Sequence, residues 1–195
     1  MARELECAVV SLVRVILGAQ LVEMPPWLVR PGKVECADRW ALVQEVYADL
    51  TGGKVLPEVM RPVERREIDA ILQRPGEPPR ILEFDEKQHF NHYRARTLGF
   101  YADEVPLAFP AAVWVERSHQ KTRLEGGGFG KPKPPLFPGD GGRHRQRAFR
   151  DALCDILPPE YGFLPTLRIG DFEVAGLLGA ADGAERMARL LDKRL

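Results

Sequence analysis

Two short segments on either side of a turn constrain the fold of this chain more than any other feature. Residues 67–72 and 81–87 place apolar and acidic side chains in near alternation, and the intervening residues 74–79 contain three Pro and one Gly. A period of two is typical of a β-strand that buries one face, and a turn rich in Pro and Gly lets the chain reverse. The sequence therefore predicts an antiparallel hairpin with one apolar face, which carries Leu82 and Phe84, and one acidic face.

Apolar residues recur at helical spacing in several other segments. They predict a helix over residues 5–17 and a second one from Trp40 to Leu50, capped by Asp38 and ended by Gly52 and Gly53. The other predicted elements are strands over residues 111–115 and 166–169 and helices over residues 91–98, 145–157 and 184–191. Together these elements predict an α/β domain with a central mixed sheet of about four or five strands flanked by helices.

Residues 125–142 contain seven Gly and four Pro, too many for a helix or an inner strand. We expect a long surface loop here, and long loops in compact domains are usually functional or disordered. Phe129 and Phe137 interrupt this loop, where they either stack on bases or anchor the loop to the body of the protein.

The length of 195 residues fits a single domain, 1–195. Within it we expect an N-terminal helical part (1–60), a core (61–170) and a C-terminal helix (171–195). Hydrophobic residues make up 45% and charged residues 29% of the chain, which excludes wholesale disorder, a collagen-like repeat and a disulfide scaffold. The 28 Lys and Arg balance the 28 Asp and Glu, so net charge points to no particular partner.

The most apolar stretch, residues 8–22, contains Arg14 and Gln20 and falls short of the roughly 20 apolar residues of a membrane span. Glu4 and Glu6 precede it, unlike the basic start of a signal peptide. We therefore expect a cytoplasmic protein without a membrane partner.

The three cysteines lie far apart and show no CxxC spacing, which argues against a thiolate zinc site and a disulfide framework. Buried free thiols are the expected state of these residues, Cys7, Cys36 and Cys154.

The acidic hairpin face carries Asp69, Glu83, Asp85 and Lys87. Neighbouring carboxylates raise one another's pKa values, and a bound cation relieves that cost. Hard oxygen ligands in this number suit Mg²⁺ or Mn²⁺, and Lys87 would then help to activate a water for attack on a phosphodiester. The alternative is a solvated strand face on which Lys87 pairs with a carboxylate.

The hairpin sequence resembles the core of the PD-(D/E)xK nuclease superfamily, in particular the branch similar to very-short-patch-repair endonucleases. The resemblance implies a restriction endonuclease-like core. It implies that Asp69 is a metal-binding aspartate, that Glu83 and Asp85 are the second-strand carboxylates, and that His89 is the downstream histidine. All four residue types stand at the expected places.

Two registers of this motif stay open. Asp85 stands where the common motif, counted from Glu83, has a Lys, whereas counting from Asp85 makes Lys87 that residue. Either Lys87 or His89 would therefore assist the water. The resemblance also implies an upstream helical glutamate, for which Glu45 is the candidate.

The spacing of His89 and His92 offers a second hypothesis, a zinc site with Asp85. Zinc usually takes a ligand set richer in nitrogen or sulfur, and His92 otherwise opens the helix over residues 91–98.

Basic residues concentrate between Arg117 and Arg150, where nine Lys and Arg face two acids, Glu125 and Asp140. A nuclease needs such a surface to neutralise phosphates; the alternative is a solvated basic loop without a ligand. The predicted nucleic-acid-binding residues are Lys131, Lys133, Arg143, Arg145, Arg147 and Arg150.

The function that these patterns and the resemblance predict is an Mg²⁺-dependent (or Mn²⁺-dependent) endonuclease that hydrolyses phosphodiester bonds in DNA, acting as a monomer or a homodimer. The catalytic residues would be Asp69, Glu83, Asp85, Lys87 and His89, of which the first three bind metal. One alternative is a catalytically inactive nucleic-acid-binding module with the nuclease fold. Another is a metal-binding protein or an enzyme with a different substrate.

Overall fold

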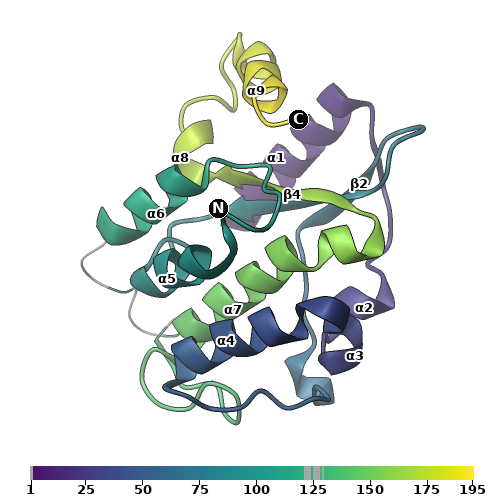
Figure 1. Cartoon of the computed structure of the whole chain (residues 1–195). Coiled ribbons are helices and arrows are strands. Elements are labelled where there is room, and N and C mark those ends of the chain that lie inside the picture. The colour runs from purple at the N-terminus through teal and green to yellow at the C-terminus, as the bar shows by residue number, and fades with distance from the viewer. Residues whose placement is uncertain (1, 121–123, 125–127, 129) are drawn as a thin grey trace.

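A four-stranded mixed sheet forms the centre of the computed structural model, which describes residues 2–120, 124, 128 and 130–195 (Figure 1). Its strands, in spatial order, are β1 (Gln20–Leu21), β2 (Ala70–Gln73), β3 (Arg80–Asp85) and β4 (Leu164–Gly170). The first three pair antiparallel, whereas β3 and β4 are parallel. The predicted hairpin is confirmed as β2 and β3, and so is a mixed sheet flanked by helices.

The described residues form helices before the hairpin, between β3 and β4, and after β4. They are α1 (Ala2–Leu17), α2 (Pro26–Val29), α3 (Lys33–Cys36), α4 (Trp40–Thr51), α5 (His92–Tyr101), α6 (Ala111–Gln120), α7 (Gly142–Ile156), α8 (Asp171–Val174) and α9 (Gly183–Asp192), with 3-10 turns at Ala37–Arg39, Pro62–Glu64 and Pro158–Tyr161. Among the described residues, no helix combines the length and the apolar composition needed to cross a membrane.

The two faces of the sheet have different chemistry. Leu82 and Phe84 of β3 join an apolar cluster with Val9 and Val13 of α1 and Met187 of α9. The opposite face carries polar side chains and is covered by α7, whose backbone accepts a hydrogen bond from the sheet. The predicted acidic face therefore exists. The alternative, a strand face exposed to solvent, is not what the structure has, because α7 covers this face.

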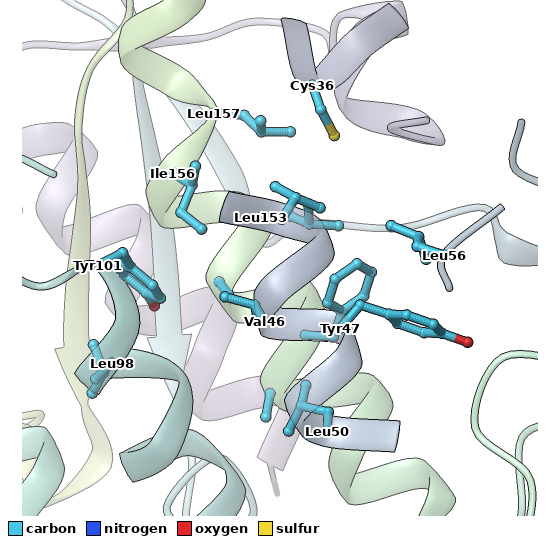
Figure 2. Packing of buried hydrophobic residues seen from close by; sticks show 14 of the residues in the cluster. Cys36, Val46, Tyr47, Leu50, Leu56, Leu98, Tyr101, Leu153, Ile156 and Leu157 are labelled. Carbon is cyan, nitrogen blue, oxygen red and sulfur yellow. The ribbon is translucent and has the colours of Figure 1, made fainter. Parts of the chain in front are cut away.

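A second apolar cluster joins α4, α5 and α7 in a layer on this side of the sheet. Figure 2 shows Val46 and Tyr47 of α4 beside Leu153 of α7, with Leu98 of α5 on the other side of the cluster. Helix α4 thus packs directly on the helix that covers the polar face. This layer fixes the position of α7 relative to the hairpin.

Most of the predicted helices and strands are present, with the usual differences at their ends. Gly52 has a φ of 72° and ends α4 in a left-handed conformation, as predicted. Asp38 does not cap that helix: it lies in the 3-10 turn at Ala37–Arg39, and Arg39 occupies the cap position.

The predicted strand over residues 111–115 is wrong, because this segment is the first half of α6. Its five apolar residues are too few to separate a strand from a buried helix by periodicity. The helical spacing becomes visible only over ten residues, where Trp114 and Ser118 are the buried positions four residues apart.

The Gly- and Pro-rich segment connects to α7 through a tight reversal. Lys133 and Phe137 form an antiparallel bridge, and a Cβ at Gly142 would lie 2.3 Å from the Phe137 carbonyl oxygen, so this position requires glycine. Phe137 is fully buried between Tyr47 and Phe149, so it anchors the segment. Phe129 lies outside the described residues.

The cysteine prediction is confirmed in part. Cys36 and Cys154 are buried free thiols, but Cys7 is exposed on α1. Cys7 lies in the first half of an amphipathic helix, on the side away from Val9 and Val13.

Candidate functional site

Asp69 and Glu83 form the acidic part of a cavity at the end of the hairpin. Asp69 lies one residue before β2, and its Oδ2 accepts a hydrogen bond of 2.6 Å from the backbone N–H of Phe84 in β3. Glu83 is in the middle of β3, 7% exposed, and its Oε1 lies 3.5 Å from the Sγ of Cys154. The hairpin therefore places two carboxylates from neighbouring strands side by side.

Burial raises the pKa of both carboxylates. The pKa of Asp69 rises from 3.8 to about 6 because burial disfavours its charged form, with smaller contributions from Glu6 and Asp85, while the Phe84 N–H opposes the rise. The pKa of Glu83 rises well above 4.5, first through burial and then through the charge of Asp69. Such a pair favours a proton or a cation between its members.

The cavity beside these carboxylates has a volume of about 290 Å³ and brings together opposite charges. Its acidic residues come from the hairpin, from α7 and from α1, and they are Glu6, Glu67, Asp69, Glu83, Glu86 and Asp151. Its basic residues are Arg66 before the hairpin and three arginines of α7. His89 also lines the cavity. This arrangement suits a ligand that carries both a cation and an anionic group.

His89 is held by two carboxylates. Its Nδ1 is 3.0 Å from the Oδ2 of Asp151 and 3.3 Å from the Oδ1 of Asp85. Although burial raises it, the pKa of Asp151 lies well below its usual range because His89 and Arg168 stabilise the carboxylate. An Nδ1–H donated to Asp151 leaves Nε2 as the acceptor nitrogen of the ring. A carboxylate-oriented histidine of this kind is typical of a general base.

Asp85, His89 and Asp151 also form a group that could hold a metal ion. One ligand atom from each lies within 4.8 Å of the others. Asp85, however, already has two hydrogen-bond donors. Its Oδ2 accepts a hydrogen bond of 2.6 Å from the Nε1 of Trp114, and its Oδ1 accepts a hydrogen bond of 2.7 Å from Arg168. The positive charge of Arg168 therefore neutralises this group from the side of β4.

Arg168 belongs to a polar network buried between β4, α5 and α7. It donates to Asp85, to the Oδ1 of Asp155 at 2.8 Å and to the backbone of Asp151 at 3.0 Å. Arg94 of α5 donates to the other oxygen of Asp155 at 2.7 Å. Arg168, Asp85, Asp155 and Arg94 are all fully buried. This network holds Asp85 and Asp151 in place around His89.

The three cavity arginines of α7 share one helix face. Arg143, Arg147 and Arg150 are separated by four and three residues, the spacing that aligns side chains on one side of a helix. Arg145 points elsewhere, with its Nη2 donating 2.5 Å to the carbonyl of Pro138. Lys131 is exposed in the preceding segment and does not line the cavity.

Lys133 is half-buried and forms the bridge to Phe137. It does not line the cavity either. The six predicted nucleic-acid-binding residues therefore divide into three at the cavity and three away from it.

Lys87 and His89, between which the motif left a choice, have different surroundings. β3 ends at Asp85 and a turn follows, so the alternation that would align Lys87 with Asp85 stops. Lys87 is exposed and lies outside the cavity lining, whereas His89 is part of it.

The helical glutamate at the cavity is Glu6 of α1, because Glu45 is exposed on α4 and does not line it. Glu6 is close enough to raise the pKa of Asp69. His92 stacks on the Tyr93 ring, 3.9 Å between centroids, and is not part of the metal-capable group found among the described residues.

Sequence reasoning missed five charged residues of this cavity: Glu6, Arg66, Glu67, Glu86 and Asp151. The one available signal was the helical spacing that places Asp151 four residues after Arg147, on the same face of α7.

No family model, curated protein or solved structure matches this chain. The resemblance to the nuclease superfamily therefore stays an interpretation of the hairpin residues, and the cavity is the structural feature that points to a function.

Proposed function

We propose that this chain is a nuclease that hydrolyses phosphodiester bonds in DNA with the help of Mg²⁺ or Mn²⁺. The observation that carries this proposal is a single cavity that joins two carboxylates of raised pKa, a carboxylate-oriented histidine and three arginines of one helix face. Phosphodiester hydrolysis needs each of these: metal ligands, a base for the water, and positive charge for the phosphate.

Asp69 and Glu83 fit a divalent cation. Both are oxygen ligands, which Mg²⁺ prefers, and both have raised pKa values, so a cation relieves the cost of ionising them together. When bound, the metal polarises the phosphoryl oxygens and lowers the pKa of a water. Asp85 was predicted as a third ligand; with its oxygens on Trp114 and Arg168, we propose that it orients His89.

His89 is proposed to accept the proton of the attacking water at Nε2. Asp151 and Asp85 contact Nδ1, and they stabilise the imidazolium that forms when Nε2 gains a proton. The arginines of α7 that line the cavity supply positive charge near the reacting phosphate as negative charge develops. The chain's own residues thus position the water, accept its proton and bind the substrate anion.

A cutting assay tests this proposal directly. Purified protein is incubated with plasmid, linear duplex DNA, single-stranded DNA and RNA in Mg²⁺, in Mn²⁺ and in EDTA. We expect metal-dependent cutting of DNA that Asp69→Asn lowers at least about a hundredfold, and that His89→Ala lowers about 10²- to 10⁴-fold. The matched control is Glu45→Gln, an exposed glutamate outside the cavity, which should cut like the wild type.

Cutting by the wild type alone would not distinguish a nuclease from a contaminant, so the cutting must disappear in folded Asp69→Asn protein. No cutting in any metal, with DNA still retained at low salt, would contradict the proposal and favour the inactive nucleic-acid-binding module. Cutting of RNA alone would contradict the assignment to DNA.

The position of the metal can be tested separately from catalysis. Mn²⁺ binding is measured by titration calorimetry for the wild type, Asp69→Asn and Asp85→Asn. Loss of binding in Asp69→Asn, with binding kept in a folded Asp85→Asn protein, supports the pair Asp69 and Glu83. The reverse result would place the metal in the group Asp85, His89 and Asp151.

A further inference from the structure

Arg66 is a buried arginine whose guanidinium is only partly satisfied. It is 3% exposed, and its Nη2 donates to the carbonyl of Arg150 at 2.9 Å and to the Sγ of Cys154 at 2.6 Å. Its Nε and Nη1 are buried and have no hydrogen-bond partner among the described residues. The buried Arg94 and Arg168 instead donate to carboxylates. A buried cation without an anionic partner is costly, so this site favours an anion.

Arg66 shares the cavity with three further guanidiniums, those of Arg143, Arg147 and Arg150. Burial and the neighbouring charges of Arg66 and Arg143 lower the pKa of Arg150 to about 10. Burial, and less strongly the charge of Arg143, also lowers the pKa of Arg147, although Asp151 opposes this shift. Four cations thus line one cavity, and an anion bound there gains from several positive charges at once.

We propose that Arg66, Arg143, Arg147 and Arg150 form a subsite for a phosphate monoester at the end of a nucleic-acid strand. This inference deepens the proposed nuclease function and rests on it for the nature of the substrate. The subsite would hold a phosphorylated end beside the carboxylates Asp69 and Glu83, which line the same cavity. The substrate class would then be a strand with a phosphorylated end within reach of the cavity.

A monoester fits this cavity better than an internal phosphate for two reasons. A monoester carries a second negative charge near neutral pH and presents three free oxygens, whereas a diester carries one negative charge and presents two free oxygens. Planar guanidinium groups bind such oxygens in pairs. Arg66 is buried, so only a group that enters the cavity reaches it. An internal phosphate is flanked by a sugar on each side, and a terminal phosphate on one side only.

The test is a binding measurement in EDTA, where no cutting takes place. One labelled single-stranded oligonucleotide is prepared with a 5′-phosphate, with a 3′-phosphate or with hydroxyls at both ends, and its affinity is measured by fluorescence anisotropy at one salt concentration. We expect one phosphorylated form to bind about tenfold more tightly than the hydroxyl form, and inorganic phosphate to compete with it. Equal affinity of all three oligonucleotides would overturn the proposal.

Two arginines of the same helix provide a matched pair of variants. Arg147→Gln should remove the preference for a phosphorylated end, because Arg147 lines the cavity. Arg145→Gln removes the same charge two residues away, outside the cavity, and should keep the preference. A second cavity variant, Arg66→Gln, is compared after its folding is checked by circular dichroism. If both folded cavity variants keep the preference, the subsite is wrong.

Failure of this inference can be distinguished from failure of the nuclease proposal. Asp69→Asn removes a carboxylate outside the four arginines, so it should stop cutting and keep the end preference. A wild type that never cuts but prefers phosphorylated ends would leave the subsite standing and remove the nuclease. A wild type that cuts DNA but shows no preference for phosphorylated ends would support the nuclease and contradict the subsite.

Discussion

The network around Arg168 and the cavity beside Asp69 contain the same residue types but differ in how well their charges are paired. In the network, Arg168 and Arg94 each donate to carboxylates at 2.7–2.8 Å, and the pKa of Asp151 is lowered despite its burial. In the cavity, Asp69 and Glu83 have raised pKa values, and Arg66 has two unpaired nitrogens. The difference shows which buried charges stabilise this fold and which are available to a ligand.

Breaking the network should have the largest effect on stability. Arg168→Met removes the arginine partner of Asp85 and leaves Asp155 with Arg94 as its remaining arginine, so Asp85 stays buried without a cationic arginine and we expect a loss of about 3–5 kcal/mol in the free energy of unfolding. Urea unfolding at pH 7 measures it. Arg186→Met, which removes a half-buried arginine 4.0 Å from Asp182, should change stability by less than about 0.5 kcal/mol. Equal effects of the two variants would mean that the network does not stabilise the fold.

A substitution in the cavity should have the opposite sign. Glu83→Gln keeps the size of the side chain and removes a buried carboxylate of raised pKa, so we expect the metal-free protein to gain about 0.5–2 kcal/mol while DNA cutting is lost. Thermal unfolding in EDTA and the plasmid assay measure the two effects. A destabilised Glu83→Gln protein would show that Glu83 is a structural residue like Asp155.

The two regions should also respond differently to pH. The raised pKa of Asp69 means that its contribution to stability is present below pH 3.8 and is lost as pH rises through about 6. The lowered pKa of Asp151 has the opposite effect, because its contribution is lost in acid.

Unfolding of wild type and Asp69→Asn should therefore be compared at several pH values between 4 and 7 in EDTA. The wild type should lose stability relative to the variant as pH rises through this range, and Mg²⁺ should offset the loss only in the wild type. A difference that does not change with pH would contradict the raised pKa of Asp69.

The smallest expected effect concerns Lys87. Because Lys87 is exposed and lies outside the cavity lining, Lys87→Met should change stability by no more than about 0.5 kcal/mol and leave cutting near the wild-type rate. Kinetics on the same DNA substrate, beside His89→Ala, measure this. A loss as large as that of His89→Ala would make Lys87 the residue that assists the water.

Much of the site was predictable where neighbouring residues on one element decide it. Asp69 and Glu83 follow from the hairpin pattern, and His89 follows from the resemblance. Helical spacing places Arg147 and Arg150 on one face of the helix predicted over residues 145–157, whereas Arg143 joins them because the helix begins at Gly142. Glu6 was not predictable, because it reaches the cavity from a distant segment of the chain. Arg66 directly precedes the hairpin, but its burial depends on its contact with α7. No local pattern in the sequence indicates which helix lies next to a strand end.

The sequence by itself determined the antiparallel hairpin, the mixed α/β character of the domain and most of its helices, because period and turn residues act over a few positions. The strand predicted over residues 111–115 was wrong, because so short a segment does not separate a strand from a buried helix by periodicity. Only the tertiary structure decided that Asp85 pairs with Arg168, that Glu83 faces a cavity, and that Arg66 is buried beside it. Burial and charge pairing depend on which distant segments pack together, and the packing of α7 against β4 sets both.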